Sequence, residues 1–114
     1  MAIEINIKQD LLLVRPTDLI NPMDNKRALD LVEEHILDGH DRILIDLEAV
    51  EFFSSAGLNF LLSLLTKSRN NGGDTVVMNI SEQASKLLIV TKLKDLFTIV
   101  NSESEAVDLL TTRA

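Results

Sequence analysis

Few side chains in this 114-residue sequence have the types and spacing that chemistry requires. The sequence contains no cysteine and two histidines, His35 and His40, neither of which stands in the H-E-x-x-H frame of a zinc protease. Three carboxylates, Asp46, Glu48 and Glu51, are close enough in sequence to suggest a metal site or a general base, but no histidine or asparagine supports them. We interpret them as solvated loop charges. We therefore expect no catalytic residue, no metal site and no cofactor, and we do not expect an enzyme.

Two common motifs for phosphate binding and hydrolysis are also missing from the sequence. Gly72 and Gly73 are not followed by the Lys and Ser or Thr that a P-loop uses to hold phosphates. No G-x-S-x-G sequence occurs, so the serine nucleophile of an α/β-hydrolase is not expected. These observations favour a binding protein over a catalyst.

Two adjacent serines open an uncharged stretch of an otherwise well-charged chain. No charged residue occurs from Ser54 to Leu65. The serines follow an apolar run and precede a leucine-rich segment, and such a strand-to-helix junction is where open α/β sheets bind ligands and partners. Ser54 or Ser55 could simply cap the helix. A hydroxyl at a helix N-terminus is also displayed at the surface, beside N–H groups that favour a phosphate, so capping and function do not exclude each other.

The serines lie between segments that alternate between strand and helix patterns. Isoleucines at positions 3, 5 and 7 alternate with polar residues, which indicates a half-buried strand. The nearly continuous apolar run at residues 42–47 indicates a strand buried on both faces. Leucines at i, i+3, i+4 and i+7 from Leu58 indicate an amphipathic helix. The expected strands span residues 3–7, 11–15, 42–47, 75–80 and 97–100, and the expected helices begin at Pro22, at the two serines, after Ser81 and after Ser102.

Turn and capping residues predict how these elements begin and end. Gln9 and Asp10 predict a tight turn between the first two strands. Asn21 before a proline predicts the start of the first helix, and Ser102 with Glu105 predicts a capping box for the last one. The chain is expected to be one α/β domain over residues 1–114, with a mixed sheet of four or five strands and about four helices.

The charge is unevenly distributed along the chain. The net charge is −7; residues 1–51 hold 12 acids and 5 bases, and the remaining residues hold 6 of each. This argues against direct nucleic-acid binding. It fits either an acidic face that steers a basic partner or a solvated surface that keeps the protein soluble. With no cysteine, no long apolar run and no signal sequence, we expect a cytoplasmic protein without a membrane segment.

Two sequence segments together carry a resemblance to a known family. The run Ile-Leu-Ile-Asp-Leu at residues 43–47, followed by Val-Glu-Phe-Phe-Ser-Ser-Ala-Gly-Leu at residues 50–58, resembles the signature of the STAS domain, in particular of bacterial anti-sigma factor antagonists. The order of predicted strands and helices matches as well, so the resemblance covers essentially the whole chain and implies the STAS fold. The segment 16–21, Pro-Thr-Asp-Leu-Ile-Asn, departs from the Gly-Glu/Asp-Leu-Asp step that many members carry.

The resemblance implies roles for individual residues. Ser55 matches the serine that a partner kinase phosphorylates, and Ser54, where many members have Asp, is the less favoured acceptor. Ala56 replaces a second serine, and Gly57 matches a family glycine that lets partner and chain approach closely. The implied partner-binding residues are Asp18, Leu19, Ser54, Ser55, Ala56, Gly57, Leu58 and Asn59.

The resemblance also implies a mechanism, a partner switch controlled by phosphorylation. Unphosphorylated at Ser55, such a protein binds and sequesters a serine kinase that is also an anti-sigma factor; phosphorylated, it lets go, and a PP2C-type phosphatase resets it. With no Trp or Tyr to anchor a dimer, we expect a monomer when free. Two alternatives stay open. One is an unmodified STAS scaffold subunit in a sensory or transport assembly, and the other is a small enzyme that uses the carboxylates between Asp46 and Glu51.

Overall fold

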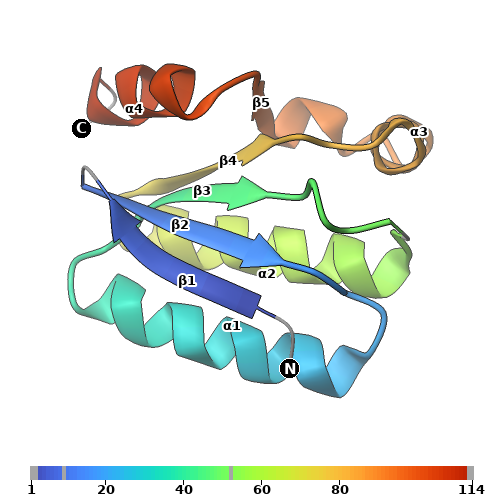
Figure 1. Ribbon diagram of the computed structural model, residues 1–114, viewed down its shortest axis with the longest axis horizontal. Coiled ribbons are helices and arrows are strands. Elements are labelled where there is room, and N and C mark those ends of the chain that lie inside the picture. Colours follow the sequence, from blue (N-terminus) through green and yellow to red (C-terminus); the bar gives the residue numbers. More distant parts are fainter. Residues whose placement is uncertain (1–2, 9, 52, 113–114) are drawn as a thin grey trace.

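The computed structural model describes residues 3–8, 10–51 and 53–112. They form a five-stranded sheet with helices on both faces (Figure 1). In chain order the elements are β1 (Ile3–Lys8), β2 (Leu11–Pro16), α1 (Pro22–Leu37), β3 (Arg42–Asp46), α2 (Ser55–Asn70), β4 (Asp74–Met78), α3 (Glu82–Val90), a 3-10 helix (Lys94–Leu96), β5 (Thr98–Val100) and α4 (Glu103–Thr112).

The sheet is mixed, as the sequence predicts. Its strand order is β1-β2-β3-β4-β5, with β1 antiparallel to β2 and the other neighbours parallel. In the register of the parallel strands, Leu13 lies beside Leu44, Leu44 beside Val76 and Val76 beside Thr98. The predicted α/β class is therefore confirmed, and the described residues form five strands and four α-helices, within the predicted four or five strands and about four helices. The turn predicted at Gln9 and Asp10 falls partly outside the described residues; Asp10 has a φ of 67°, the left-handed conformation that such turns use.

Alternate residues of the central strands enter two cores. Leu12, Val14, Ile43 and Ile45 pack in the larger core, with the buried faces of α1, α2 and α3. Leu11, Leu13 and Leu44 pack in a smaller core with Ala106 and Leu110 of α4. Figure 1 shows α1 and α2 on one face of the sheet and α4 on the other. Because both faces are covered, β2, β3 and β4 carry consecutive apolar residues, which explains the continuous apolar run read from the sequence.

Helix starts follow the capping residues that the sequence contains. The Asn21 side chain accepts hydrogen bonds from the N–H groups of Met23 and Asp24, and Pro22 occupies the first turn. The Ser81 hydroxyl caps α3 through the Ala84 N–H at 3.1 Å.

The predicted capping box at α4 forms with one change of partner. The Glu105 N–H donates to Ser102 Oγ at 3.1 Å, as expected. The Glu105 carboxylate accepts from the N–H of Asn101 at 3.1 Å, one residue before the position that a standard box uses.

Two strands end earlier than the sequence suggested. β3 stops at Asp46 and β4 at Met78, against expected ends at residues 47 and 80. Asn79 has a φ of 60°, a left-handed conformation that breaks an extended strand. The β3–α2 loop therefore begins directly after Asp46. Within the described ranges, no helix is both long enough and apolar enough to cross a membrane.

Candidate functional site

The two serines lie where the β3–α2 loop meets α2. Ser54 is the N-cap residue, in an extended conformation with φ −122° and ψ −174°, and it is half-buried. Ser55 is the first residue of α2 and is exposed. Figure 1 shows that α1 and α2 both begin on the side of the sheet toward which the β3 arrow points. The structure thus places Ser55 at the carboxyl edge of the parallel strands, the edge at which such sheets bind ligands.

The N-terminus of α2 differs from those of the other three long helices. No side chain in the described part of the chain caps it, and its first turn holds no acidic residue. By contrast, α1, α3 and α4 have side-chain caps and acids in the first turn. Ser54 is the N-cap residue, as one of the two expected candidates, but its hydroxyl makes no capping hydrogen bond to the helix. The first-turn N–H groups and the helix dipole are left to interact with another acceptor.

Three of the predicted partner-binding residues lie beneath the surface. Leu19, in the β2–α1 loop, is 2% exposed, and Leu58, in α2, is 8% exposed, because both side chains pack in the larger core; Gly57 in the same turn of α2 is also buried. A Cβ on Gly57 would stand 3.0 Å from two ring carbons of Phe53 and 3.5 Å from the Leu19 Cβ. The close approach that this glycine allows is therefore internal to the chain. These residues shape the site from below rather than offer side chains to a partner.

Three other predicted residues share one groove between α1 and α2. Ser55, Ala56 and Asn59 line a hollow of about 550 Å³ together with residues of α1 such as Lys26 and Leu29. Ser55 and Asn59 are exposed, and Ala56 is half-buried. A groove beside an exposed hydroxyl gives a partner a surface to fit while it reaches Ser55.

Asp18 lies on the neighbouring β2–α1 loop and faces a separate hollow. It is exposed, and its Oδ1 accepts a hydrogen bond from the N–H of Ile20 at 2.7 Å, which shapes the loop. Asp18, Ile20 and Glu51 line a shallow hollow of about 250 Å³ between this loop and the β3–α2 loop. Two carboxylates therefore flank an exposed apolar side chain, a combination that suits a partner surface with a cationic and apolar contact.

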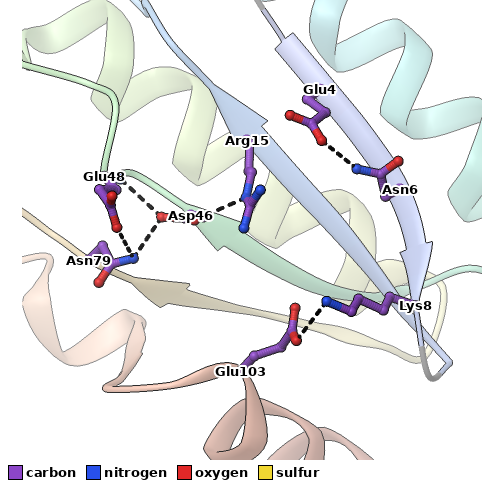
Figure 2. A network of polar contacts seen from close by, with 8 residues as sticks. All are labelled: Glu4, Asn6, Lys8, Arg15, Asp46, Glu48, Asn79 and Glu103. Carbon is purple, nitrogen blue, oxygen red and sulfur yellow. Dashed lines mark hydrogen bonds and ion pairs between the residues drawn. The ribbon is translucent and has the colours of Figure 1, made fainter.

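Asp46 anchors the loop that leads to the serines (Figure 2). Its side chain is 8% exposed and makes three hydrogen bonds: Oδ2 accepts from Arg15 Nε at 3.1 Å, and Oδ1 accepts from the Glu48 N–H at 3.0 Å and from Asn79 Nδ2 at 2.9 Å. Asn79 Nδ2 also donates to Glu48 Oε2 at 3.2 Å. Asp46 thus ties the start of the loop to β2 and to the residue after β4. The interpretation of Asp46 as a solvated loop charge is wrong, because the strand end buries it among donors.

The structure does not bring Asp46, Glu48 and Glu51 to one common site. Glu48 and Glu51 are exposed, as expected, and Glu51 lines a different hollow from Asp46. No group of three or more His, Cys, Asp or Glu side chains among the residues the structure describes could hold a metal ion. The rings of His35 and His40 lie 6.2 Å apart between centroids and are tilted by 58° to each other, near the C-terminal end of α1.

Sequence reasoning did not single out two polar residues near the site, Asn25 and Asn79. Asn25 is 7% exposed and occupies the buried stripe of α1 with Ala28 and Val32. An asparagine at helical spacing with apolar residues signals a buried amide that must find partners. Asn79, directly after a strand, signals the left-handed turn that brings its side chain to Asp46.

Comparison with known families matches residues 2–106 to the STAS domain. The match spans nearly the whole chain, together with the strand order and helices described above. The chain therefore belongs to the STAS domain family.

Solved structures support the same fold. A candidate anti-sigma factor antagonist of Thermotoga maritima is 21% identical and superposes with a TM-score of 0.85, covering 96% of this chain and 94% of that one. The anti-sigma factor antagonist SpoIIAA, in its unphosphorylated form, is 18% identical with a TM-score of 0.79 and 97% coverage of both chains. SLC26A9 is 12% identical with a TM-score of 0.69, and the match covers 92% of this chain but 20% of that one. At these identities the likeness shows the fold.

Proposed function

We propose that this protein is an anti-sigma factor antagonist that switches partners through phosphorylation of Ser55. Unphosphorylated, it binds and sequesters a serine kinase that is also an anti-sigma factor; phosphorylated, it releases that partner; and a PP2C-type phosphatase restores the first state. The observation that carries the proposal is the exposed Ser55 hydroxyl at an uncapped helix start, within the Ser-Ser-Ala-Gly-Leu segment that resembles the family signature.

The N-terminus of α2 can accommodate the added charge. A phosphoryl group adds about −1.5 to −2 charges and three acceptor oxygens. At a helix N-terminus the dipole interaction is favourable by about 0.3–1 kcal/mol, and no acidic side chain in this first turn opposes it. Phosphorylation at Ser55 should therefore leave the fold intact.

The same group disfavours a bound partner. A partner seated over Ser55 and Asn59 would have to remove water from the phosphate, which costs several kcal/mol where the partner offers no cation or hydrogen-bond donor in its place. A net loss of about 3–4 kcal/mol weakens binding by two to three decades, which is enough for a switch. The proposed contact surface is Asp18, Ser54, Ser55, Ala56 and Asn59, with Leu19, Gly57 and Leu58 supporting it from beneath.

The proposal includes a cellular location, an oligomeric state and a class of partner. It acts in the cytoplasm as a monomer when free, without a cofactor, and binds a protein rather than a nucleic acid, consistent with its net charge of −7.

A scaffold role is the second candidate. The resemblance to part of SLC26A9, in which the matched region is 20% of the chain, favours it because the same fold there is one part of a larger protein. In that role the surface around Ser55 binds a neighbour in an assembly and the serine is never modified.

The experiment that separates these functions uses affinity-tagged protein recovered with its partner from its native cells. ATP is added to the recovered complex, and phosphate incorporation and partner release are followed together. We expect wild type and Ser54→Ala to gain one phosphate and lose the partner, whereas Ser55→Ala gains none and keeps it. A partner that stays bound to wild type without any phosphate transfer would contradict the switch and favour the scaffold.

A further inference from the structure

Asn25 is a buried amide whose two polar contacts reach different segments of the site. Its Nδ2 donates to the carbonyl oxygen of Leu19 at 2.8 Å and to that of Ala56 at 3.3 Å. Leu19 lies in the β2–α1 loop, and Ala56 follows Ser55 in α2. One side chain of α1 therefore joins the loop that carries Asp18 to the turn that carries Ser55.

The chemistry of the contact specifies an amide donor. Both partners are carbonyl oxygens, which only accept, so the NH₂ group must face them. An aspartate of the same size has no hydrogen to donate, and an apolar side chain leaves both bonds unmade. Because Asn25 is 7% exposed, losing its amide leaves two mostly buried carbonyl oxygens without their donor, which costs free energy.

Apolar contacts also hold the β2–α1 loop against α2, but they do not fix its orientation. The Leu19 side chain is 2% exposed and lies beside Gly57. A Cβ added to Gly57 would stand 3.5 Å from the Leu19 Cβ. Such contacts hold the loop near α2 but constrain its orientation weakly, because burial is not directional. The two Asn25 hydrogen bonds have fixed directions and set the position of the loop along the helix start.

We infer that Asn25 is a positioning residue that aligns the Asp18 loop with the Ser55 turn, so that the two segments present one partner surface. This inference rests on the proposed function for its consequence, but its structural part stands on the two hydrogen bonds. Without the amide, the loop stays near α2 but its orientation relative to the Ser55 turn is less constrained, and a partner has to order the two segments on binding. The ordering cost lowers affinity and the rate of phosphate transfer to Ser55.

The first test compares local with global stability. Asn25→Leu and Asn25→Asp are measured against Val32→Ala, a control on the same buried stripe of α1 that makes a cavity but leaves the amide in place. Amide hydrogen exchange is followed at Leu58, whose N–H bonds Ser54 at 3.0 Å in the first turn of α2, and at Leu44 in the centre of the sheet.

We expect Asn25→Leu to raise exchange at Leu58 by about fivefold, the factor that loss of the hydrogen bond to the Ala56 carbonyl corresponds to, with a smaller change at Leu44. Asn25→Asp should raise exchange at Leu58 by at least as much, because its carboxylate would face two carbonyl oxygens. Val32→Ala should raise exchange at both amides in proportion to its lower stability. If the Asn25 variants leave Leu58 at the wild-type rate, or raise Leu58 and Leu44 together as the control does, Asn25 is a packing residue only and the inference is wrong.

The second test measures whether the loss of the Asn25 amide lowers the phosphorylation of Ser55. Tagged wild type, Asn25→Leu and Val32→Ala are recovered from native cells, and the phosphorylated fraction of the Ser55 peptide is measured by mass spectrometry. We expect a fraction about fivefold lower in Asn25→Leu than in wild type, with Val32→Ala near wild type. Equal fractions in all three overturn the positioning role while the proposed function stands. No phosphate on wild type overturns the proposed function, and the Leu58 comparison then decides the inference about Asn25 by itself.

Discussion

Removing the Asp46 carboxylate should break the contacts that hold the β3–α2 loop, which leads to the serines, and lower the stability of the protein. The cleanest perturbation is a pair of substitutions, Asp46→Ala and Asp46→Asn. Alanine removes all three hydrogen bonds that the carboxylate accepts. Asparagine keeps an oxygen that can still accept from the Glu48 N–H and from Asn79 Nδ2, but it turns an amide donor toward the Arg15 guanidinium, which is also a donor.

The expected magnitudes follow from burial. A hydrogen bond to a charged group contributes about 1.5–3 kcal/mol. The Arg15 side chain is 46% exposed and can turn to water, so its ion pair contributes less, about 0.5–1 kcal/mol. The variant also avoids the desolvation of the buried carboxylate, which offsets part of the loss. We therefore expect the free energy of unfolding to fall by about 2–3 kcal/mol in Asp46→Ala and by about 1 kcal/mol in Asp46→Asn.

The assay is urea unfolding followed by far-ultraviolet circular dichroism, because the chain has no Trp or Tyr for fluorescence. With an m-value of about 1.5 kcal/mol/M, the midpoint should fall by about 1.5 M in Asp46→Ala and about 0.7 M in Asp46→Asn. Glu48→Ala is the matched control, because Glu48 is an exposed acid two residues away whose side chain bonds only the edge of the network. It should change stability by less than about 0.5 kcal/mol.

Two results would refute this reasoning. Asp46→Ala within about 0.5 kcal/mol of wild type would mean that the network contributes nothing measurable. Asparagine as destabilising as alanine would mean that charge, rather than the hydrogen bonds of Oδ1, holds the loop.

Three further predictions concern the surface around Ser55. Ser55→Ala should keep the fold and lock the partner-bound state, whereas Ser55→Asp, with one charge instead of about two, should weaken partner binding only in part, as read by calorimetry with the recovered partner. Gly57→Val should lower the unfolding free energy by about 2–4 kcal/mol, since its Cβ would stand 3.0 Å from the Phe53 ring, while Ala56→Val in the same turn should cost under about 1 kcal/mol; equal midpoints for the two would contradict the close packing. Asp18→Asn should slow partner association at low salt by about twofold, and the difference should vanish as salt is raised; an unchanged rate at low salt would exclude steering by this carboxylate.

Much of the fold follows from local pattern and capping. Residues 42–47 indicated a strand buried on both faces because helices cover both sides of the sheet, and Asn21 began α1 because its side chain accepts from the first-turn N–H groups. Strand ends were less predictable. The sequence of β4 continues with an apolar residue at Ile80, but Asn79 adopts the left-handed conformation that stops the strand, and its side chain donates to Asp46.

The position of Ser55 could be predicted from the sequence, but the buried residues that hold the site in place could not. Ser55 could be placed at the helix start because the leucine spacing defines α2 and its first exposed residue. The resemblance implied that Leu19 and Leu58 bind a partner, but both side chains are buried in the larger core. Asn25 contacts Ala56, and Asp46 contacts Arg15; in each pair the residues are 31 positions apart in the sequence. No local sequence pattern indicates partners at such a distance.

The central claim is that Ser55 receives a phosphate in the living cell, and peptide mapping of the native protein tests it most directly. The protein is purified from its own cells under several growth conditions, its intact mass is measured, and the peptide that holds Ser54 and Ser55 is sequenced by fragmentation. The account predicts a substoichiometric gain of one phosphate, on Ser55. A protein that carries no phosphate there under any condition, while a partner still purifies with it, would contradict the switch.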